Sequence, residues 1–182
     1  MQVQELFATF RRYWQVEDRP QWESLLQGDS FRWEYGETPL SHVKYPIVGV
    51  AVYLVVVFAL REWMRNRTRF ELKAVIRYHN ALLCVWSFLM LVGTLYPVAK
   101  LVLSDGLVET LCDERNDLLP NSSLFSYVAW HYYASKYYEL LDTVIIVLKK
   151  NPLTLLQMWH HISVLILTWT WQEASWSICW WG

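Results

Sequence analysis

Two adjacent histidines stand in a run of residues that is otherwise apolar enough to lie in a lipid bilayer. His160 and His161 precede ISVLILTWTW, and Gln157 comes three residues before the first histidine and four before the second. Neutral imidazole near pH 7 takes a proton or attacks a carbonyl carbon, and a hydrogen bond from a neighbour fixes its tautomer. We therefore expect one histidine to react and the other to support it, with Gln157 close enough to help either.

Four polar side chains stand in the apolar run before the histidines. Lys136, Glu139, Asp142 and Thr143 fall within an arc of about 120° if residues 124–148 form a helix. Lys136 and Glu139 have the spacing of an ion pair that only fixes packing, but this pair leaves Asp142 without a basic partner nearby in its own helix. Ionisable groups within a bilayer are costly, so we favour a polar stripe that lines a cavity.

The composition is that of a membrane protein. The chain has 182 residues, of which 54% are hydrophobic and 12 are Trp. The net charge of -1 and the clustering of basic residues in one loop give no reason to expect a nucleic-acid partner. Cys84, Cys112 and Cys179 lack the spacing of a zinc site, so no metal is expected. The first 27 residues lack the apolar core and cleavage site of a secretory signal peptide.

Four apolar runs predict an all-α, multi-pass transmembrane bundle. Each run approaches the roughly 20 residues that a bilayer requires, and Pro97 is late enough in the second run to kink or end it. A polar, aromatic-rich segment (residues 1–44) precedes this transmembrane domain (45–171), and a Trp-rich tail (172–182) comes after it. The four expected spans are residues 46–64, 80–103, 124–148 and 153–171.

Charged loops orient these spans. The loop REWMRNRTRFELKAVIR is strongly basic and should remain in the cytosol, which places the N-terminus in the lumen. Residues 104–123 are acidic and should be lumenal, whereas Lys149 and Lys150 return the chain to the cytosol. The sequon at Asn121 would then be open to glycosylation and the one at Asn66 would not. Cys112 and Cys179 both fall on the lumenal side, where a disulfide between them can persist.

The N-terminal segment admits two interpretations. Its aromatic residues suit one side of a helix at the membrane surface, but Pro20, Gly28 and Pro39 interrupt the rest of the segment, so a plain flexible arm fits as well. The aromatic residues in question are Phe7, Phe10, Tyr13 and Trp14.

The two polar motifs together resemble one family. Residues 136–143, KYYELLDT, are similar to the KxxExxDT signature of the ELO family of very-long-chain fatty acid elongases, and residues 157–161, QMWHH, are similar to its histidine box. The resemblance extends over residues 45–171. Gln157 stands where the family box commonly begins with histidine, as in variants that look like elongases acting on polyunsaturated chains.

The resemblance implies an activity and a location. Family members are multi-pass proteins of the endoplasmic reticulum membrane that condense malonyl-CoA with a long-chain acyl-CoA, giving 3-oxoacyl-CoA, CO2 and CoA without another cofactor. By this resemblance His160 and His161 are catalytic, while Lys136, Glu139 and Asp142 shape the polar end of the cavity. Thr143 and Gln157 belong to the same motifs. Other elongases and enzymes of the elongation cycle are expected partners.

Two alternatives to a complete elongase are left open by the sequence. The family has seven spans and this sequence ends after the fourth expected one, so we expect a truncated, weakly active form that could act as a subunit of another elongase. Di-iron desaturases and hydroxylases also place HxxHH motifs in membrane helices. They need more histidine ligands than the five present in this chain, so this alternative is disfavoured.

Overall fold

The computed structural model describes residues 11–26, 30–112, 118 and 122–173. Within these residues every regular element is a helix, which confirms the prediction of an all-α fold. The elements are η1 (Trp22–Leu26), α2 (Lys44–Met64), α3 (Lys73–Asp105), α4 (Leu107–Leu111), α6 (Ser123–Glu139), α7 (Leu141–Leu148) and α8 (Leu155–Glu173).

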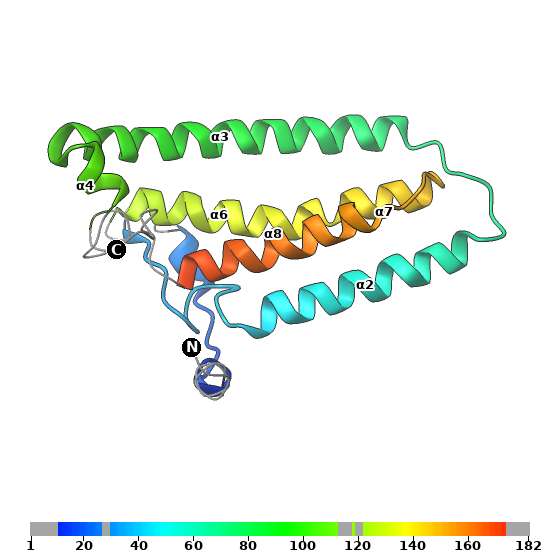
Figure 1. Ribbon diagram of the computed structural model, residues 1–182, viewed down its shortest axis with the longest axis horizontal. Coiled ribbons are helices and arrows are strands. Elements are labelled where there is room, and N and C mark those ends of the chain that lie inside the picture. Colours follow the sequence, from blue (N-terminus) through cyan, green and yellow to red (C-terminus); the bar gives the residue numbers. More distant parts are fainter. Residues whose placement is uncertain (1–10, 27–29, 113–117, 119–121, 174–182) are drawn as a thin grey trace.

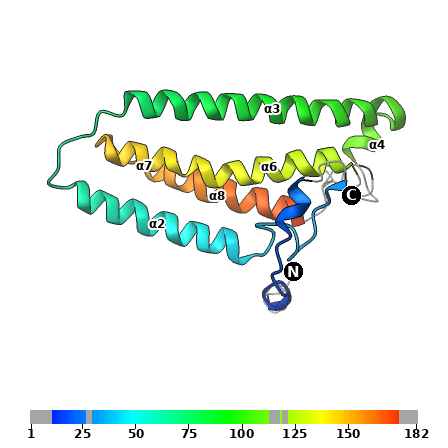
Figure 2. The same ribbon diagram turned by 180° about the vertical axis from the view of Figure 1, so that it is seen from behind.

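The long helices lie side by side in three layers. Helices α6, α7 and α8 form the middle layer, with α3 on one side of it and α2 on the other (Figure 1). The same order is visible from behind in Figure 2. Helix α3 packs mainly against α6, α2 packs against α7 and α8, and α6 packs against α8. The middle layer therefore has a different neighbour on each face.

Among the described residues, two helices are long and apolar enough to cross a membrane. They are α2 and α3, whose side chains are mostly exposed and apolar, as expected of surfaces that contact lipid. Helix α3 begins at Lys73, seven residues before the start of the predicted second span. Pro97 lies inside α3, which continues to Asp105, so of the two expected effects of Pro97, a kink or an end, it does not end the helix. The four-span count and the orientation remain predictions.

The third predicted span consists of two helices. Helix α6 ends at Glu139 and α7 begins at Leu141, with Leu140 between them. Helix α6 packs against α3 and α8, whereas α7 packs against α2. The fourth predicted span corresponds to α8, which begins two residues later than expected and continues to Glu173.

The described part of the N-terminal segment packs across the ends of the helices. Phe31, His42 and Val43 are buried, and Val43 belongs to the same hydrophobic cluster as Leu165 of α8. Residues 11–15 are helical, as the first interpretation expected, whereas the packing of residues 30–43 does not fit a flexible arm. That this helix lies at a membrane surface stays a prediction. Phe7 and Phe10 lie outside the described residues.

Indole and phenol groups on the helices form hydrogen bonds to the backbone of this segment. Leu40 has a φ of 68°, a left-handed conformation that a leucine adopts only when its surroundings stabilise it. Hydrogen bonds to the carbonyl groups of three consecutive residues supply that stabilisation. Trp130 Nε1 donates to Pro39 (2.8 Å), Tyr133 Oη to Leu40 (3.0 Å) and Trp169 Nε1 to Ser41 (2.6 Å).

The predictions for the acidic loop lie mostly outside the described residues. Cys112 is in a disulfide, but its predicted partner Cys179 is not among the described residues, so that pairing stays a prediction. The sequon at Asn121 is likewise outside them. Cys84 is a free, exposed cysteine on α3.

Candidate active site

The last turn of α6 holds the ion pair that the sequence spacing suggested. Lys136 Nζ lies 2.6 Å from Glu139 Oε1, and the two side chains are only 11% and 24% exposed. Residues three apart on a helix are neighbours on its surface, which is why these groups meet. The Lys136 ammonium also lies 4.2 Å from the centre of the Tyr132 ring, and Ser135 donates a hydrogen bond to Glu139. The positive charge is therefore shared between a carboxylate and an aromatic face.

The second carboxylate finds its partner on another helix. His79 of α3 is 5% exposed, and its Nε2 lies 2.6 Å from Asp142 Oδ1. The other ring nitrogen, Nδ1, lies 3.1 Å from the hydroxyl of Tyr138, whose ring stacks on the imidazole. Sequence reasoning missed His79. The signal was indirect, because a carboxylate among apolar residues, without a basic neighbour in its own helix, requires a partner from elsewhere.

Thr143 faces a different neighbour from Asp142. Its side chain is completely buried, and its hydroxyl lies 2.9 Å from the hydroxyl of Tyr53 on α2. Consecutive residues on a helix diverge by about 100°, so Asp142 can reach α3 while Thr143 reaches α2. The predicted polar face is thus divided between the two outer layers.

The histidine pair lies in α8, beside the polar residues of α6 and α7. The rings of His160 and His161 are 5.8 Å apart between centres, with His160 exposed and His161 half-buried. Helix α8 packs against α6, and the charges of Asp142, Glu139 and Lys136 act on His161. One histidine therefore lies within electrostatic reach of the three ionisable groups that the sequence singled out.

Gln157 lies in the first turn of α8. It is half-buried, and its backbone N–H donates to the hydroxyl of Thr154, 3.3 Å away, at the helix N-terminus. This position is one turn before the histidines, as the spacing predicted. Its part in the site stays a prediction.

An apolar groove of about 490 Å³ runs between α3 and α6. Val85, Leu89 and Met90 line its α3 side, and Gly93 lets α6 approach so closely that a Cβ there would lie 2.7 Å from Val128. Trp86 lines the same groove, and its ring lies 6.2 Å from that of Tyr138, the hydroxyl partner of His79. Aromatic contacts thus connect this apolar groove to the hydrogen bonds of His79.

Within the described part of the chain, no group of three or more His, Cys, Asp or Glu side chains is arranged to hold a metal ion. Asp142, the carboxylate that acts most strongly on His161, is instead paired with the imidazole of His79.

Comparison with known proteins gives one consistent family. Residues 38–182 match the sequence model of the ELO family, which is described as the GNS1/SUR4 family. A Dictyostelium discoideum protein described as a candidate fatty acid elongase is 40% identical over 161 residues, which cover 88% of this chain and 53% of that protein.

Two further relatives have similar names. Fatty acid elongase sre1 of the same organism is 37% identical over 84% of this chain and 56% of its own length. Very long chain fatty acid elongase 6 of Drosophila melanogaster is 32% identical over 65% of this chain and 37% of its own length. This chain thus spans about half the length of the two Dictyostelium discoideum relatives. No solved structure matches it.

Proposed function

This chain belongs to the ELO family of fatty acid elongases, and on that premise we propose that it acts in fatty acid elongation as the condensing enzyme, a very-long-chain 3-oxoacyl-CoA synthase. The reaction joins malonyl-CoA to a long-chain acyl-CoA and releases CO2 and CoA. The observation that supports this best is the position of His161 within electrostatic reach of Lys136, Glu139 and Asp142.

In the first half of the proposed reaction, an imidazole nitrogen of His160 or His161 attacks the carbonyl carbon of the acyl thioester. The carbon–sulfur bond breaks, and the CoA thiolate leaves with the proton that the imidazole gives up. The acyl group is then held on nitrogen. The second histidine lies next to the first and can move this proton.

In the second half, malonyl-CoA loses CO2 and becomes a carbanion stabilised by its own thioester. This carbon attacks the acyl group, the carbon–nitrogen bond to imidazole breaks, and the imidazole regains a proton. The Lys136 ammonium is suited to stabilise the oxyanion that forms at the thioester carbonyl, because its charge acts in a poorly hydrated site. Glu139 holds that ammonium in place.

Asp142 and its partner have a positioning role in this scheme. The His79 imidazole fixes the Asp142 carboxylate on the side of α7 that faces the reaction, and the carboxylate acts electrostatically on His161. Thr143, tied to Tyr53, joins α7 to α2, and Gln157 supports the histidines from the preceding turn. The groove between α3 and α6 offers hydrocarbon surroundings for the acyl chain.

The cellular setting is also part of the proposal. Malonyl-CoA and acyl-CoA are cytosolic or membrane-associated substrates, and α2 and α3 have the length and hydropathy of membrane spans. We place the chain in the endoplasmic reticulum membrane, in contact with other elongases or elongation-cycle enzymes. Fluorescence microscopy of the tagged chain against a reticulum marker tests this location.

The activity test uses the purified chain with radiolabelled malonyl-CoA and a panel of long-chain acyl-CoA thioesters. The 3-oxoacyl product should form with the wild-type chain, and His160→Ala and His161→Ala should each lower its rate by about a hundredfold or more, since each group is assigned to bond making or proton transfer. Trp159→Phe, a neighbouring change at an exposed side chain, is the matched control and should keep the rate.

Two results would contradict this proposal. If both histidine variants kept the wild-type rate, imidazole chemistry would be wrong for this chain. If the chain made product only when a longer elongase co-purified with it, and did so equally well without its histidines, the chain would be a subunit of that enzyme and not itself the catalyst.

A further inference from the structure

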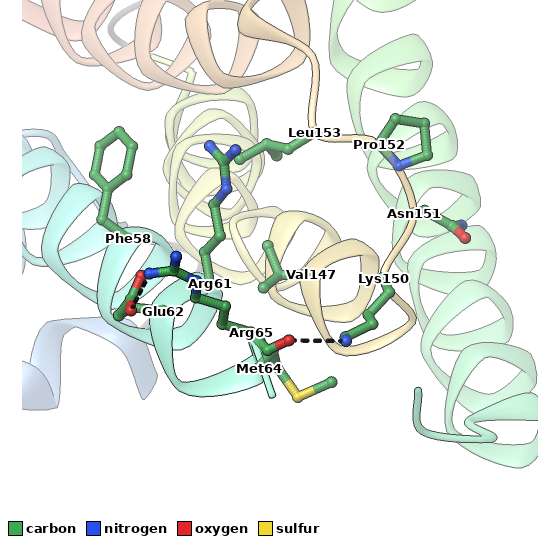
Figure 3. A pocket seen from close by; sticks show the side chains of 10 residues that line it. All are labelled: Phe58, Arg61, Glu62, Met64, Arg65, Val147, Lys150, Asn151, Pro152 and Leu153. Carbon is green, nitrogen blue, oxygen red and sulfur yellow. Dashed lines mark hydrogen bonds and ion pairs between the residues drawn. The ribbon is translucent and has the colours of Figure 1, made fainter. Parts of the chain in front are cut away.

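An open pocket of about 730 Å³ lies where α2 and α7 end, at the end of the bundle that holds the basic loop. Arg61 and Arg65 of α2 line it together with Lys150 and Asn151 from the turn between α7 and α8 (Figure 3). In Figure 3 Arg61 crosses toward the Leu153 side of the pocket, whereas Arg65 turns toward Glu62 on its own helix. The pocket thus gathers basic groups from two separate segments.

The positive charges exceed the negative ones. Glu62 pairs with Arg65 at 3.2 Å, whereas Arg61 has no carboxylate partner among the described residues. Lys150 Nζ donates to the backbone carbonyl of Arg65, 3.3 Å away, and thereby links the two segments. Lys150 has a φ of 56°, a backbone conformation unusual for a lysine, at the turn that brings it to the pocket. Three cations therefore face one carboxylate.

Helix dipoles account for only part of this excess. Both α2 and α7 end at this pocket, and the C-terminus of a helix is equivalent to roughly half a negative charge. Two such ends offset about one of the two surplus positive charges. About one positive charge remains for an external anion.

The rest of the lining is apolar. Phe58 is 52% exposed and lies on the same helix as Val55, which is also exposed, while Val147 and Met64 form the buried wall. A ligand that suits this pocket has an anionic oxygen group joined to hydrocarbon. We propose that the pocket binds the phosphate group of an anionic phospholipid, whose acyl chains lie along the exposed face of α2.

The position of the pocket separates it from the proposed chemistry. It opens on the α2 side of the middle layer, whereas Asp142 is paired with α3 on the opposite side. A buried cluster that includes Val57 and Val147 fills the space between α2 and α7. A lipid headgroup, which approaches from the bilayer, reaches this pocket directly, and its binding does not depend on elongase activity.

Native mass spectrometry of the purified chain in neutral detergent tests the proposal. Phosphatidylserine and phosphatidylcholine are titrated against the wild-type chain, against the pocket variant Arg61→Gln/Arg65→Gln/Lys150→Gln, and against a control. The control, Arg69→Gln/Lys73→Gln/Arg77→Gln, removes the same charge from residues outside the pocket. The wild type and the control should prefer phosphatidylserine, and the pocket variant should lose about tenfold or more of that affinity.

Three results would overturn the proposal. Equal losses in the pocket variant and the control would show a general charge effect. If the pocket variant kept its lipid affinity and only its melting temperature fell, these basic residues would offset the helix dipoles and would not bind lipid. Displacement of phosphatidylserine by stoichiometric CoA would assign the pocket to the substrate. Loss of phosphatidylserine binding in the pocket variant alone, with an unchanged melting temperature, would support it whether or not the chain elongates acyl chains.

Discussion

The imidazole of His79 and the carboxylate of Asp142 meet at 2.6 Å and join α3 to α7. The histidine is almost completely buried, and Tyr138 occupies its second ring nitrogen. A carboxylate among apolar helices is costly unless it is paired, so this contact explains how Asp142 is tolerated. It also fixes the carboxylate whose charge acts most strongly on His161.

The first prediction concerns this pair. His79→Ala should lower kcat of condensation about 10- to 100-fold, because a hydrogen bond to a charged group contributes about 1.5–3 kcal/mol. KM for acyl-CoA should change little, since His79 touches no substrate in the proposed scheme. Steady-state kinetics with varied acyl-CoA separate the two constants.

A double-mutant cycle is the control for this prediction. His79→Ala and Asp142→Asn should cost less together than the sum of their single effects, because both remove the same interaction. Strictly additive effects would contradict a positioning role for His79.

The second prediction concerns the hydroxyl contact between Thr143 and Tyr53. Thr143→Val keeps the side-chain shape but leaves the Tyr53 hydroxyl without its partner, so we expect a loss of about 1 kcal/mol in the free energy of unfolding. Condensation activity should stay close to that of the wild type. Thermal unfolding in detergent and the product assay measure both quantities. A stable but inactive variant would place Thr143 in the chemistry.

The third prediction concerns the attachment of the N-terminal segment. Trp169→Phe removes the donor to the Ser41 carbonyl, and an unsatisfied buried polar group costs about 1–3 kcal/mol. The melting temperature should fall and protease should cut more readily before residue 44. Trp159→Phe, which alters an exposed indole, is the control and should change neither. Unchanged protease resistance in the Trp169 variant would contradict the packing of this segment against α8.

The fourth prediction concerns pH. Trp33 Nε1 donates to Glu173 Oε1 at 2.6 Å, just beyond the predicted fourth span. Burial raises the pKa of Glu173 from 4.5 to about 7, and the Trp33 hydrogen bond acts in the opposite direction. The folded state therefore binds the proton more tightly than the unfolded state. The contribution of protonated Glu173 to the stability of the fold is complete below about pH 4.5 and is lost as pH rises through 7.

Glu173→Gln tests this pH dependence, because glutamine still accepts a hydrogen bond from Trp33 but does not titrate in this range. Melting temperatures measured from pH 5 to 8 should fall more steeply for the wild type than for the variant. Parallel curves would show that Glu173 does not titrate differently in the two states.

The sequence predicted the helical class and the contact between Lys136 and Glu139, since hydropathy and spacing along one helix are local signals. Lys136 and Glu139 meet because they share one helix, which spacing alone specifies. His79 was missed because its partner is 63 positions away, and no periodicity encodes a contact between helices.

The packing of the N-terminal segment was equally hidden from local analysis. Its aromatic residues suited a membrane surface, and its prolines suited an irregular arm. What holds it are hydrogen bonds from distant indoles, such as that of Trp130, to backbone carbonyls that every sequence possesses. Backbone acceptors have no signature in the sequence, so such contacts emerge only in three dimensions.

The interruption at Leu140 divides the third predicted span into two helices that pack against different neighbours. Helix α6, before Leu140, packs against α3 and α8, and α7, after Leu140, packs against α2. Asp142 lies in the first turn of α7. A displacement of α2 would therefore act on α7 and on the contact between Asp142 and His79 more directly than on the ion pair between Lys136 and Glu139.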